Sequence, residues 1–176
     1  MQAIRCVFFD RDGIVNESPG AGKYVTRLED FHVLPEFVDS LRVARALGYH
    51  AVIVSNQRAV ALGLVSAHGV EAIHGKLREI LRVPHSLDLL DILYCPHDVG
   101  QCECRKPLPG MLTEAAARHG IDLASSWMVG DSETDVEAGR RAGCRTIRVG
   151  GEGEASSADL RVTAMKDLPP LLERVL

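Results

Sequence analysis

Short apolar runs alternate with longer amphipathic segments along most of the chain. The runs are rich in Val, Ile, Leu and aromatic residues, which is typical of strands buried in a sheet. They predict strands at 6–9, 51–54, 89–94, 126–129 and 144–149, with a shorter one near 161–163. Apolar residues recur at helical spacing over 35–47, 66–82, 109–119 and 133–142, and a last helix is expected from residue 168. This alternation predicts an α/β fold, a doubly wound, mostly parallel sheet with helices on both faces.

Polar residues gather where the predicted strands end. Asp10, Ser55 and Asp131 each follow an apolar run directly, and Lys106 lies in the segment that enters a helix. The carboxyl ends of parallel strands meet at one edge of a sheet, and ligands bind at that edge. We therefore expect these four side chains to converge there.

The first strand ends in two carboxylates one residue apart. Side chains at i and i+2 of a strand point the same way, so Asp10 and Asp12 can address one ligand where the extended geometry persists. Gly13 lets the chain turn away directly after them. By residue preference alone, residues 10–13 could equally form a solvated turn, and the rest of the chain has to decide between these interpretations.

Together, the strand ends supply the groups that phosphoryl transfer needs. Asp10 can attack phosphorus to form an aspartyl-phosphate, while Asp12 protonates the leaving oxygen and later takes a proton from the hydrolysing water. Mg²⁺ would be held by Asp10, the backbone carbonyl of Asp12 and Asp131, because this ion prefers oxygen ligands. Ser55 and Lys106 would bind the phosphate oxygens that are not transferred.

A loop at 95–104 carries three cysteines and a histidine, a set of donors suited to tetrahedral zinc. The donors are Cys95, His97, Cys102 and Cys104. Four protein ligands leave no open position, so the zinc would be structural and would hold the loop that delivers Arg105 and Lys106. A redox pair or unliganded thiols are the other interpretations of these residues.

Length and charge narrow the class of protein. The chain has 176 residues, which suits one domain over 1–176, and a formal net charge of -4. Interspersed charges argue against a nucleic-acid-binding tail or a polybasic membrane surface, and no uncharged stretch approaches the length that spans a bilayer. We expect a cytoplasmic monomer without nucleic-acid or membrane partners, and the clustered cysteines fit a reducing compartment.

Four segments, in order, resemble the motifs of the haloacid dehalogenase superfamily of phosphatases. They are Asp-Arg-Asp-Gly at 10–13, Ser-Asn-Gln at 55–57, Arg-Lys-Pro at 105–107, and Gly-Asp at 130–131 with Asp135. The resemblance spans roughly residues 4–149 and implies the α/β fold and a magnesium-dependent phosphatase activity. Asp135 could instead be a surface residue on the helix that follows, and we favour Asp131 as the metal ligand.

The zinc loop and the Cys-Arg-Lys-Pro and Pro-Gly-Met segments after it are similar to D-glycero-D-manno-heptose 1,7-bisphosphate phosphatases. Histidinol-phosphate phosphatases share much of this pattern. The resemblance implies a small phosphorylated sugar as substrate, with Arg105 recognising it and Asn56 lining the same pocket. The chain departs from the family at Leu62, where the family carries Arg, and it has an additional cation at Arg58. These departures leave the identity of the sugar open.

About thirty-five residues separate Asn16 from the second predicted strand, and a loop and a helix account for most of them. A separate cap domain would need more, so we expect an open site with selectivity in the loops around Lys23, Arg58 and Arg105. Two alternatives remain, a nucleic-acid 3′-phosphatase and a non-catalytic, zinc-stabilised binding module. The acidic balance counts against the first, and the intact catalytic residues count against the second.

Overall fold

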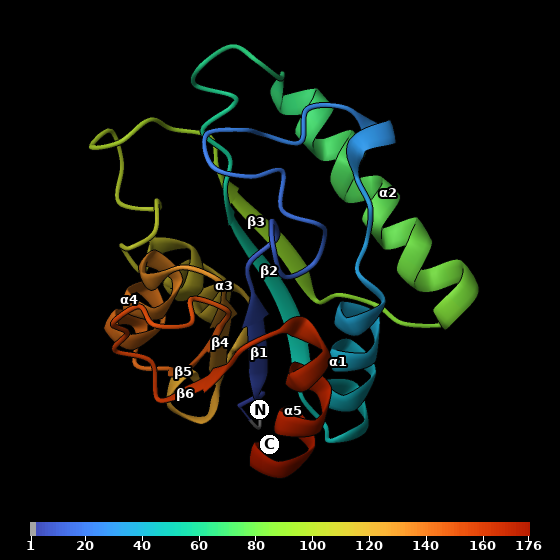
Figure 1. Cartoon of the computed structure of the whole chain (residues 1–176), viewed down its shortest axis with the longest axis vertical. Helices are drawn as coiled ribbons and strands as arrows, with labels where there is room; N and C mark the ends of the chain where they lie inside the picture. Colours follow the sequence, from blue (N-terminus) through green and yellow to red (C-terminus); the bar gives the residue numbers. More distant parts are fainter. Residues whose placement is uncertain (1–2) are drawn as a thin grey trace.

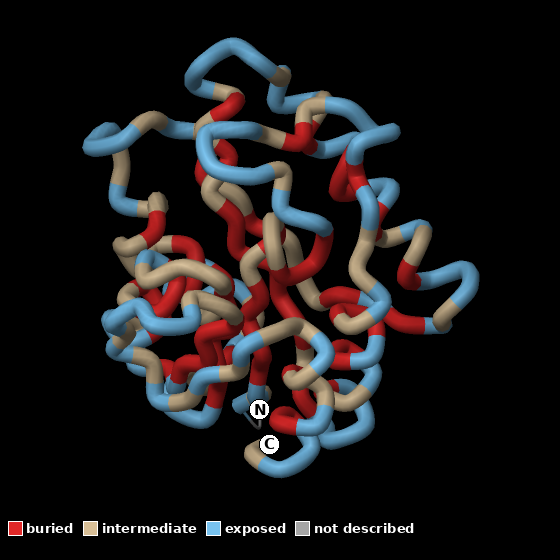
Figure 2. Tube along the Cα trace, viewed as in Figure 1, coloured by how far each residue is buried: buried red, intermediate tan, exposed pale blue. Residues whose placement is uncertain are grey.

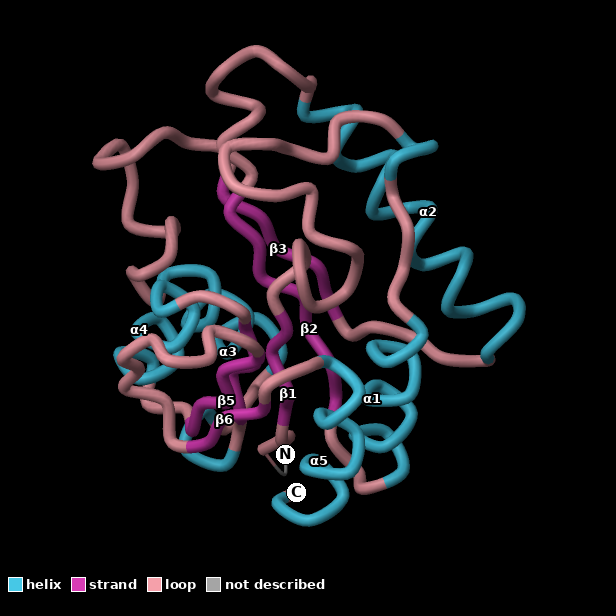
Figure 3. The backbone as a smooth tube through the Cα atoms, viewed as in Figure 1, coloured by secondary structure: helices cyan, strands magenta, loops and turns pink. Residues whose placement is uncertain are grey.

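The computed structural model describes residues 3–176, in which a six-stranded sheet carries helices on both faces (Figure 1, Figure 3). All strand pairs are parallel, and the strand order is β3-β2-β1-β4-β5-β6. The strands are β1 (Cys6–Phe9), β2 (His50–Asn56), β3 (Asp91–Cys95), β4 (Trp127–Gly130), β5 (Arg145–Val149) and β6 (Leu160–Val162). The doubly wound parallel sheet predicted from the hydrophobic pattern is confirmed.

The helices lie close to their predicted positions. Within residues 3–176 they are α1 (Pro35–Ala46), α2 (Ala67–His85), α3 (Gly110–His119), α4 (Glu133–Ala142) and α5 (Leu168–Val175), with 3-10 turns η1 (Leu28–Asp30), η2 (Leu123–Ser125) and η3 (Met165–Asp167). Ser66 caps α2 as predicted, because its side chain accepts a hydrogen bond from the Gly69 N–H. The predicted end of α2 at 82 was wrong, since the helix continues through the exposed Pro84 and ends where Ser86 turns left-handed, with φ 54°.

Several strand boundaries also differ from the prediction, by most at β2 and β3. β2 extends beyond the predicted 51–54, so Ser55 and Asn56 belong to the strand itself. β3 begins at Asp91 instead of residue 89, because its pairing with β2 starts where Asp91 meets Val52.

The core lies on both sides of the sheet, and successive residues of β1 alternate between the two sides. Val7 and Phe9 pack into the layer that contains α1, α2 and α5, whereas Cys6 and Phe8 pack into the layer that contains α3 and α4. Figure 2 shows the buried positions concentrated along the sheet. Cover on both faces explains why the strands are continuous apolar runs.

The strand order places a switch point beside β1. The chain moves outward from β1 to β2 and β3, and then returns to β4 on the other side of β1. Ligands of open α/β sheets bind at the carboxyl ends of the strands at such a point. Residues 17–34 form a loop with the single turn η1 and no second domain, as expected. Across 3–176, no helix combines the length and apolar character that crossing a membrane requires.

Candidate active site

Lys106 lies at the centre of the polar residues at this sheet edge. Its Nζ is 2.7 Å from Oδ1 of Asp10 and 2.6 Å from Oδ1 of Asp135, and it donates a 2.8 Å hydrogen bond to the Val54 carbonyl. A lysine ammonium has three N–H donors, so each has an acceptor although the residue is only 3% exposed. The site therefore holds one buried cation between two carboxylates.

Three carboxylates, those of Asp10, Asp131 and Asp135, each place an oxygen within 4.8 Å of the others. Burial raises the pKa of Asp10 to about 7, with a further increase from Asp135 that Lys106 opposes. Burial also raises the pKa of Asp131 to about 6, again with a contribution from Asp135. Burial favours a lower pKa for Lys106, but the two carboxylates outweigh it and raise that pKa. The cluster carries more negative charge than Lys106 offsets, which suits a bound dication.

The two aspartates at the start of α4 have different surroundings. Asp135 is 1% exposed, and its Oδ2 accepts hydrogen bonds from the Ser132 N–H at 3.1 Å and the Ser132 hydroxyl at 2.6 Å. The alternative of a surface position for Asp135 was wrong, because the capping box of α4 turns it inward to Lys106. Within residues 3–176, no side chain forms an ion pair with Asp131, so its carboxylate is the better placed of the two to hold a metal ion.

Two glycines allow these acids to approach the strand ends. Gly13 has φ +90°, and a Cβ there would collide with Oδ2 of Asp131. A Cβ on Gly130 would collide with the side chain of Asp135. Because neither position has room for a side chain, the close approach of β1 and β4 to the acids depends on these glycines.

Asp12 is not one of the three clustered carboxylates, but its charge contributes to the raised pKa of Asp131. Its two oxygens accept hydrogen bonds from Arg11 Nη2 at 2.9 and 3.0 Å, from Asn16 Nδ2 at 2.9 Å and from Gln57 Nε2 at 3.2 Å. Gln57 also donates to the Ser55 hydroxyl at 2.6 Å. The sequence prediction gave Arg11 and Gln57 no role, and no local pattern indicates that they meet Asp12.

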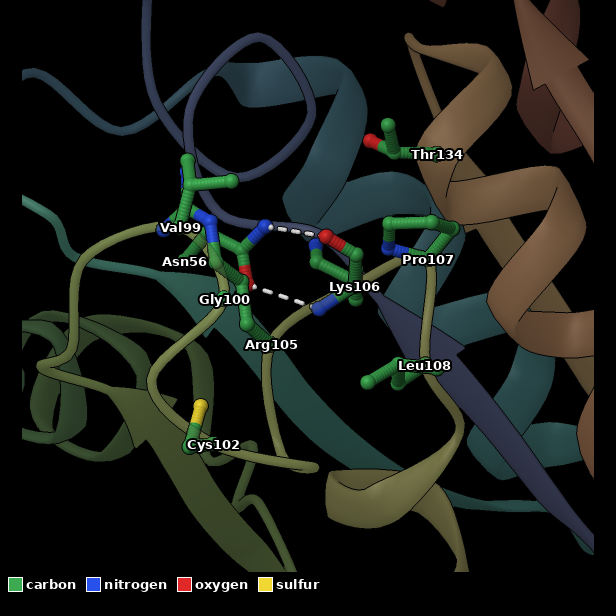
Figure 4. A pocket seen from close by; sticks show the side chains of 9 residues that line it. All are labelled: Asn56, Val99, Gly100, Cys102, Arg105, Lys106, Pro107, Leu108 and Thr134. Atoms are coloured by element: carbon green, nitrogen blue, oxygen red, sulfur yellow. Dashed lines mark hydrogen bonds between the residues drawn. The ribbon is translucent and has the colours of Figure 1, made fainter.

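Asn56 fixes the segment that carries Lys106. Its Nδ2 donates to the Lys106 carbonyl and its Oδ1 accepts from the Lys106 N–H, both at 3.0 Å (Figure 4). Asn56 borders the pocket as expected, but both polar atoms of its amide are engaged by the backbone. Its structural effect is thus to hold Lys106 against the end of β2.

A cavity of about 360 Å³ opens beside Lys106. Arg105 borders it together with Val99, Gly100 and Thr134, so the zinc loop and α4 contribute opposite walls (Figure 4). The Arg105 guanidinium donates to the His97 carbonyl at 3.4 Å. The cavity therefore extends from Arg105 on the loop to Lys106, which pairs with Asp10 and Asp135 at the sheet edge.

The ligand atoms of the four predicted zinc donors all lie within 4.8 Å of one another. The separations are 3.4 Å from Cys95 Sγ to Cys102 Sγ, 3.2 Å from Cys104 Sγ to Cys102 Sγ, and 3.6 and 3.4 Å from His97 Nδ1 to the sulfurs of Cys95 and Cys104. All five cysteines are free, and these sulfur separations exceed a disulfide bond. Donors at such spacing fit the corners of a tetrahedral zinc site.

Other predicted cations lie farther from the acids. Arg58 forms an ion pair with Asp98 of the zinc loop, 2.6 Å from Nε to Oδ1. Lys23 is exposed on the loop before η1, and Leu62 is 44% exposed. Arg58 thus connects the loop after β2 to the zinc loop, whereas no contact connects Lys23 to the carboxylates.

The comparisons with known proteins agree with this geometry. A family model described as HAD-hydrolase-like matches residues 103–169. The chain is 35% identical to the D-glycero-alpha-D-manno-heptose-1,7-bisphosphate 7-phosphatase of Photorhabdus laumondii, over 84% of each protein. It is 34% identical to the D-glycero-beta-D-manno-heptose-1,7-bisphosphate 7-phosphatase of Yersinia pestis, over 98% of this chain and 97% of that protein.

A solved structure supports the same relationship. The D,D-heptose 1,7-bisphosphate phosphatase from B. bronchiseptica, complexed with magnesium and phosphate, superposes with a TM-score of 0.87. It is 28% identical, and the match covers 98% of this chain and 100% of that one. The chain therefore belongs to the HAD-like hydrolases, as a member of the family of D-glycero-D-manno-heptose-1,7-bisphosphate 7-phosphatases.

Proposed function

We propose that the protein hydrolyses D-glycero-D-manno-heptose 1,7-bisphosphate to the 1-phosphate through an aspartyl-phosphate at Asp10. The observation that carries the proposal is the Asp10–Lys106 pair beside Asp131, with Lys106 bordering the same cavity as Arg105. The names of the relatives support the sugar and the position of the phosphate that is removed. Those names include both anomers, so the proposal concerns the 7-phosphate and leaves the anomer open.

In the first half of the reaction, an oxygen of Asp10 attacks the phosphorus of the 7-phosphate. The bond between phosphorus and the sugar oxygen breaks, and that oxygen takes a proton from Asp12. Lys106 and Ser55 bind the phosphate oxygens that are not transferred. Magnesium held by Asp10, the backbone carbonyl of Asp12 and Asp131 would supply positive charge to the phosphate and the carboxylates.

In the second half, water attacks the phosphorus of the aspartyl-phosphate. Asp12 takes a proton from this water as the bond between phosphorus and Asp10 breaks, which releases phosphate and restores both carboxyl groups. Burial, followed by the charge of Asp135, raises the pKa of Asp10. Positive charge bound beside the phosphate would therefore favour the ionised carboxylate that attacks phosphorus. In this proposal Asp10 is the nucleophile, and Asp12 gives and takes the protons.

The cavity and the zinc loop would recognise the rest of the substrate. Arg105 borders the cavity and is close enough to the loop backbone to bond the His97 carbonyl. A guanidinium binds phosphate through paired N–H donors, so we assign the 1-phosphate to Arg105. Zinc held by the cysteines and His97 would fix the loop, and the ion pair from Arg58 to Asp98 would restrain it further.

Steady-state kinetics with Mg²⁺ on a set of phosphate esters test the proposal. We expect the highest kcat/KM for heptose 1,7-bisphosphate, with histidinol phosphate and nucleic-acid 3′-phosphates far below it. Asp10→Asn should remove turnover of every ester, because it removes the nucleophile. A preference for histidinol phosphate would overturn the choice of substrate, and undiminished hydrolysis by Asp10→Asn would overturn the mechanism.

A further inference from the structure

The carboxylate of Asp12 is surrounded by donors from three different side chains. Arg11 Nη2 lies 2.9 Å from Oδ1 and 3.0 Å from Oδ2, and Arg11 Nε lies 3.2 Å from Oδ1. Asn16 Nδ2 donates to Oδ1 at 2.9 Å, and Gln57 Nε2 donates to Oδ2 at 3.2 Å. Hydrogen bonds from several directions fix both the position and the plane of the carboxylate.

Arg11 is an unusual residue to find in this position, since its side chain is fully buried. Burial of a guanidinium is costly, and one ion pair to a neighbouring residue rarely repays it in stability. The guanidinium carbon also lies 5.9 Å from the ring centroid of Phe31, which is buried. A cation clamped between an aromatic ring and Asp12 is suited to orienting that carboxylate.

Gln57 connects Asp12 to the phosphate-binding side of the site. Its Nε2 donates to Ser55 Oγ at 2.6 Å as well as to Asp12, and Gln57 is 1% exposed. One amide group therefore sets the distance between the hydroxyl assigned to phosphate and the carboxylate assigned to proton transfer. Movement of either group would break a hydrogen bond from the buried Gln57 amide.

Every hydrogen bond that Arg11, Asn16 and Gln57 make to Asp12 has an N–H donor, and the Asp12 carboxylate accepts it. We propose that Arg11 and Gln57 are positioning residues that hold Asp12 as the base for the second half of the reaction. In that step, water attacks the phosphorus of the aspartyl-phosphate, its proton passes to Asp12, and the bond between phosphorus and Asp10 breaks. The inference rests on the proposed function and adds which residues make hydrolysis of the intermediate fast.

Burst kinetics with p-nitrophenyl phosphate and Mg²⁺ separate the two halves. Nitrophenolate leaves without a proton, so formation of the aspartyl-phosphate from this ester does not need Asp12 as an acid. At saturating p-nitrophenyl phosphate we expect Arg11→Lys and Gln57→Met to release one nitrophenolate per site at close to the wild-type rate, with a raised KM in Gln57→Met because Ser55 loses a hydrogen bond. Steady-state turnover should then be roughly 100-fold slower than in the wild type, with the phosphorylated enzyme accumulating in acid-quenched samples.

The result that would overturn the inference is a burst that slows as much as the steady state, or variants that keep wild-type turnover. Arg148→Lys is the matched control, because Arg148 is a buried arginine that pairs with Glu133 and Glu154 instead of Asp12. It should change thermal stability without accumulation of the phosphorylated enzyme. Gln57→Met decides the question if Arg11→Lys does not fold. A wild type that hydrolyses the ester but never becomes phosphorylated on Asp10 would contradict the proposed function instead.

Discussion

Lys106 determines the charge balance of the site at the scale of single residues. It offsets part of the negative charge of Asp10 and Asp135 from a position with almost no exposure. Asp135 serves two groups at once, since one oxygen pairs with Lys106 and the other caps α4. Asp135 thereby couples the stability of α4 to the position of Lys106 and of its partner Asp10.

The substitution Asp135→Asn tests this coupling. An amide can still accept the cap hydrogen bonds from Ser132, but it removes the charge that faces Lys106. We expect kcat to fall roughly 100-fold because Lys106 loses one of its two carboxylate partners, and the free energy of unfolding to fall by ~3 kcal/mol because a buried ion pair is broken. Asp122→Asn is the control, because Asp122 caps η2 away from the site. Equal losses of activity in the two variants would contradict the assignment.

His74 is a buried base that the reaction does not use. It is 4% exposed, and burial, followed by the charge of Arg11, lowers its pKa from 6.5 to about 4. The unfolded chain therefore binds a proton more readily between these values, and His74 lowers stability as the pH falls through them. Relative to the wild type, His74→Gln should gain about 3 kcal/mol between pH 6.5 and 4 in denaturant unfolding. A difference that does not vary with pH would refute this.

The residues predicted from sequence were those that strand ends bring together. Asp10 and Asp131 come together because parallel strands align their carboxyl ends, and Lys106 joins Asp10 from the segment that Asn56 holds. Ser55 lies at the end of β2, where Gln57 donates to its hydroxyl. The interior position of Asp135 was missed, although its spacing from Ser132 resembles a capping box. The Arg11 and Gln57 contacts could not be predicted, since they depend on the direction of side chains across three segments.

At the scale of elements, the zinc loop leads into Arg105 and Lys106, which both border the cavity. Its four donors lie at one point, and Arg58 holds its Asp98 from the loop after β2. Lys106 has a separate anchor, because Asn56 binds its backbone from the end of β2. Zinc would therefore fix the loop that leads to Arg105, whereas the end of β2 fixes Lys106.

Cys102→Ser should separate the effects of these two anchors. Without one of the four ligands the loop should lose its zinc and move Arg105, while the Asp10–Lys106 pair stays in place. We expect KM for heptose 1,7-bisphosphate to rise roughly 10-fold or more, with p-nitrophenyl phosphate hydrolysis almost unchanged. Cys144→Ala, at a buried cysteine outside the loop, should leave both the zinc content and KM as they are. Parallel losses on the two substrates would argue against this division.

The turn after β1 is the second element under tight constraint. Gly13 and Gly22 both have positive φ, but only at Gly13 would a Cβ meet another residue, Asp131. Gly13→Ala should therefore weaken Mg²⁺ binding at least roughly 10-fold, beyond the cost of about 1 kcal/mol for the backbone. Gly22→Ala should show only the backbone cost. Titration calorimetry with Mg²⁺ distinguishes them, and equal affinities would rule out the steric argument.

In the whole molecule, the strand order brings the carboxyl ends of β1 and β4 side by side, and the loops form no domain over the cavity. The sheet order and the two helical layers follow from alternating apolar runs and amphipathic segments, and both were predicted. Element ends were predicted less well, as the longer β2 and α2 show, because pairing partners and caps decide them. The short segment between β1 and α1 explains why no cap domain covers the cavity.

A crystal structure with Mg²⁺ and beryllium fluoride, a mimic of a bound phosphoryl group, tests the central claim most directly. We expect beryllium bonded to an oxygen of Asp10 and one magnesium ion in contact with both Asp10 and Asp131. We also expect Lys106 on the fluoride side of the adduct. An adduct on another residue, or a magnesium ion bound away from Asp131, would contradict the account.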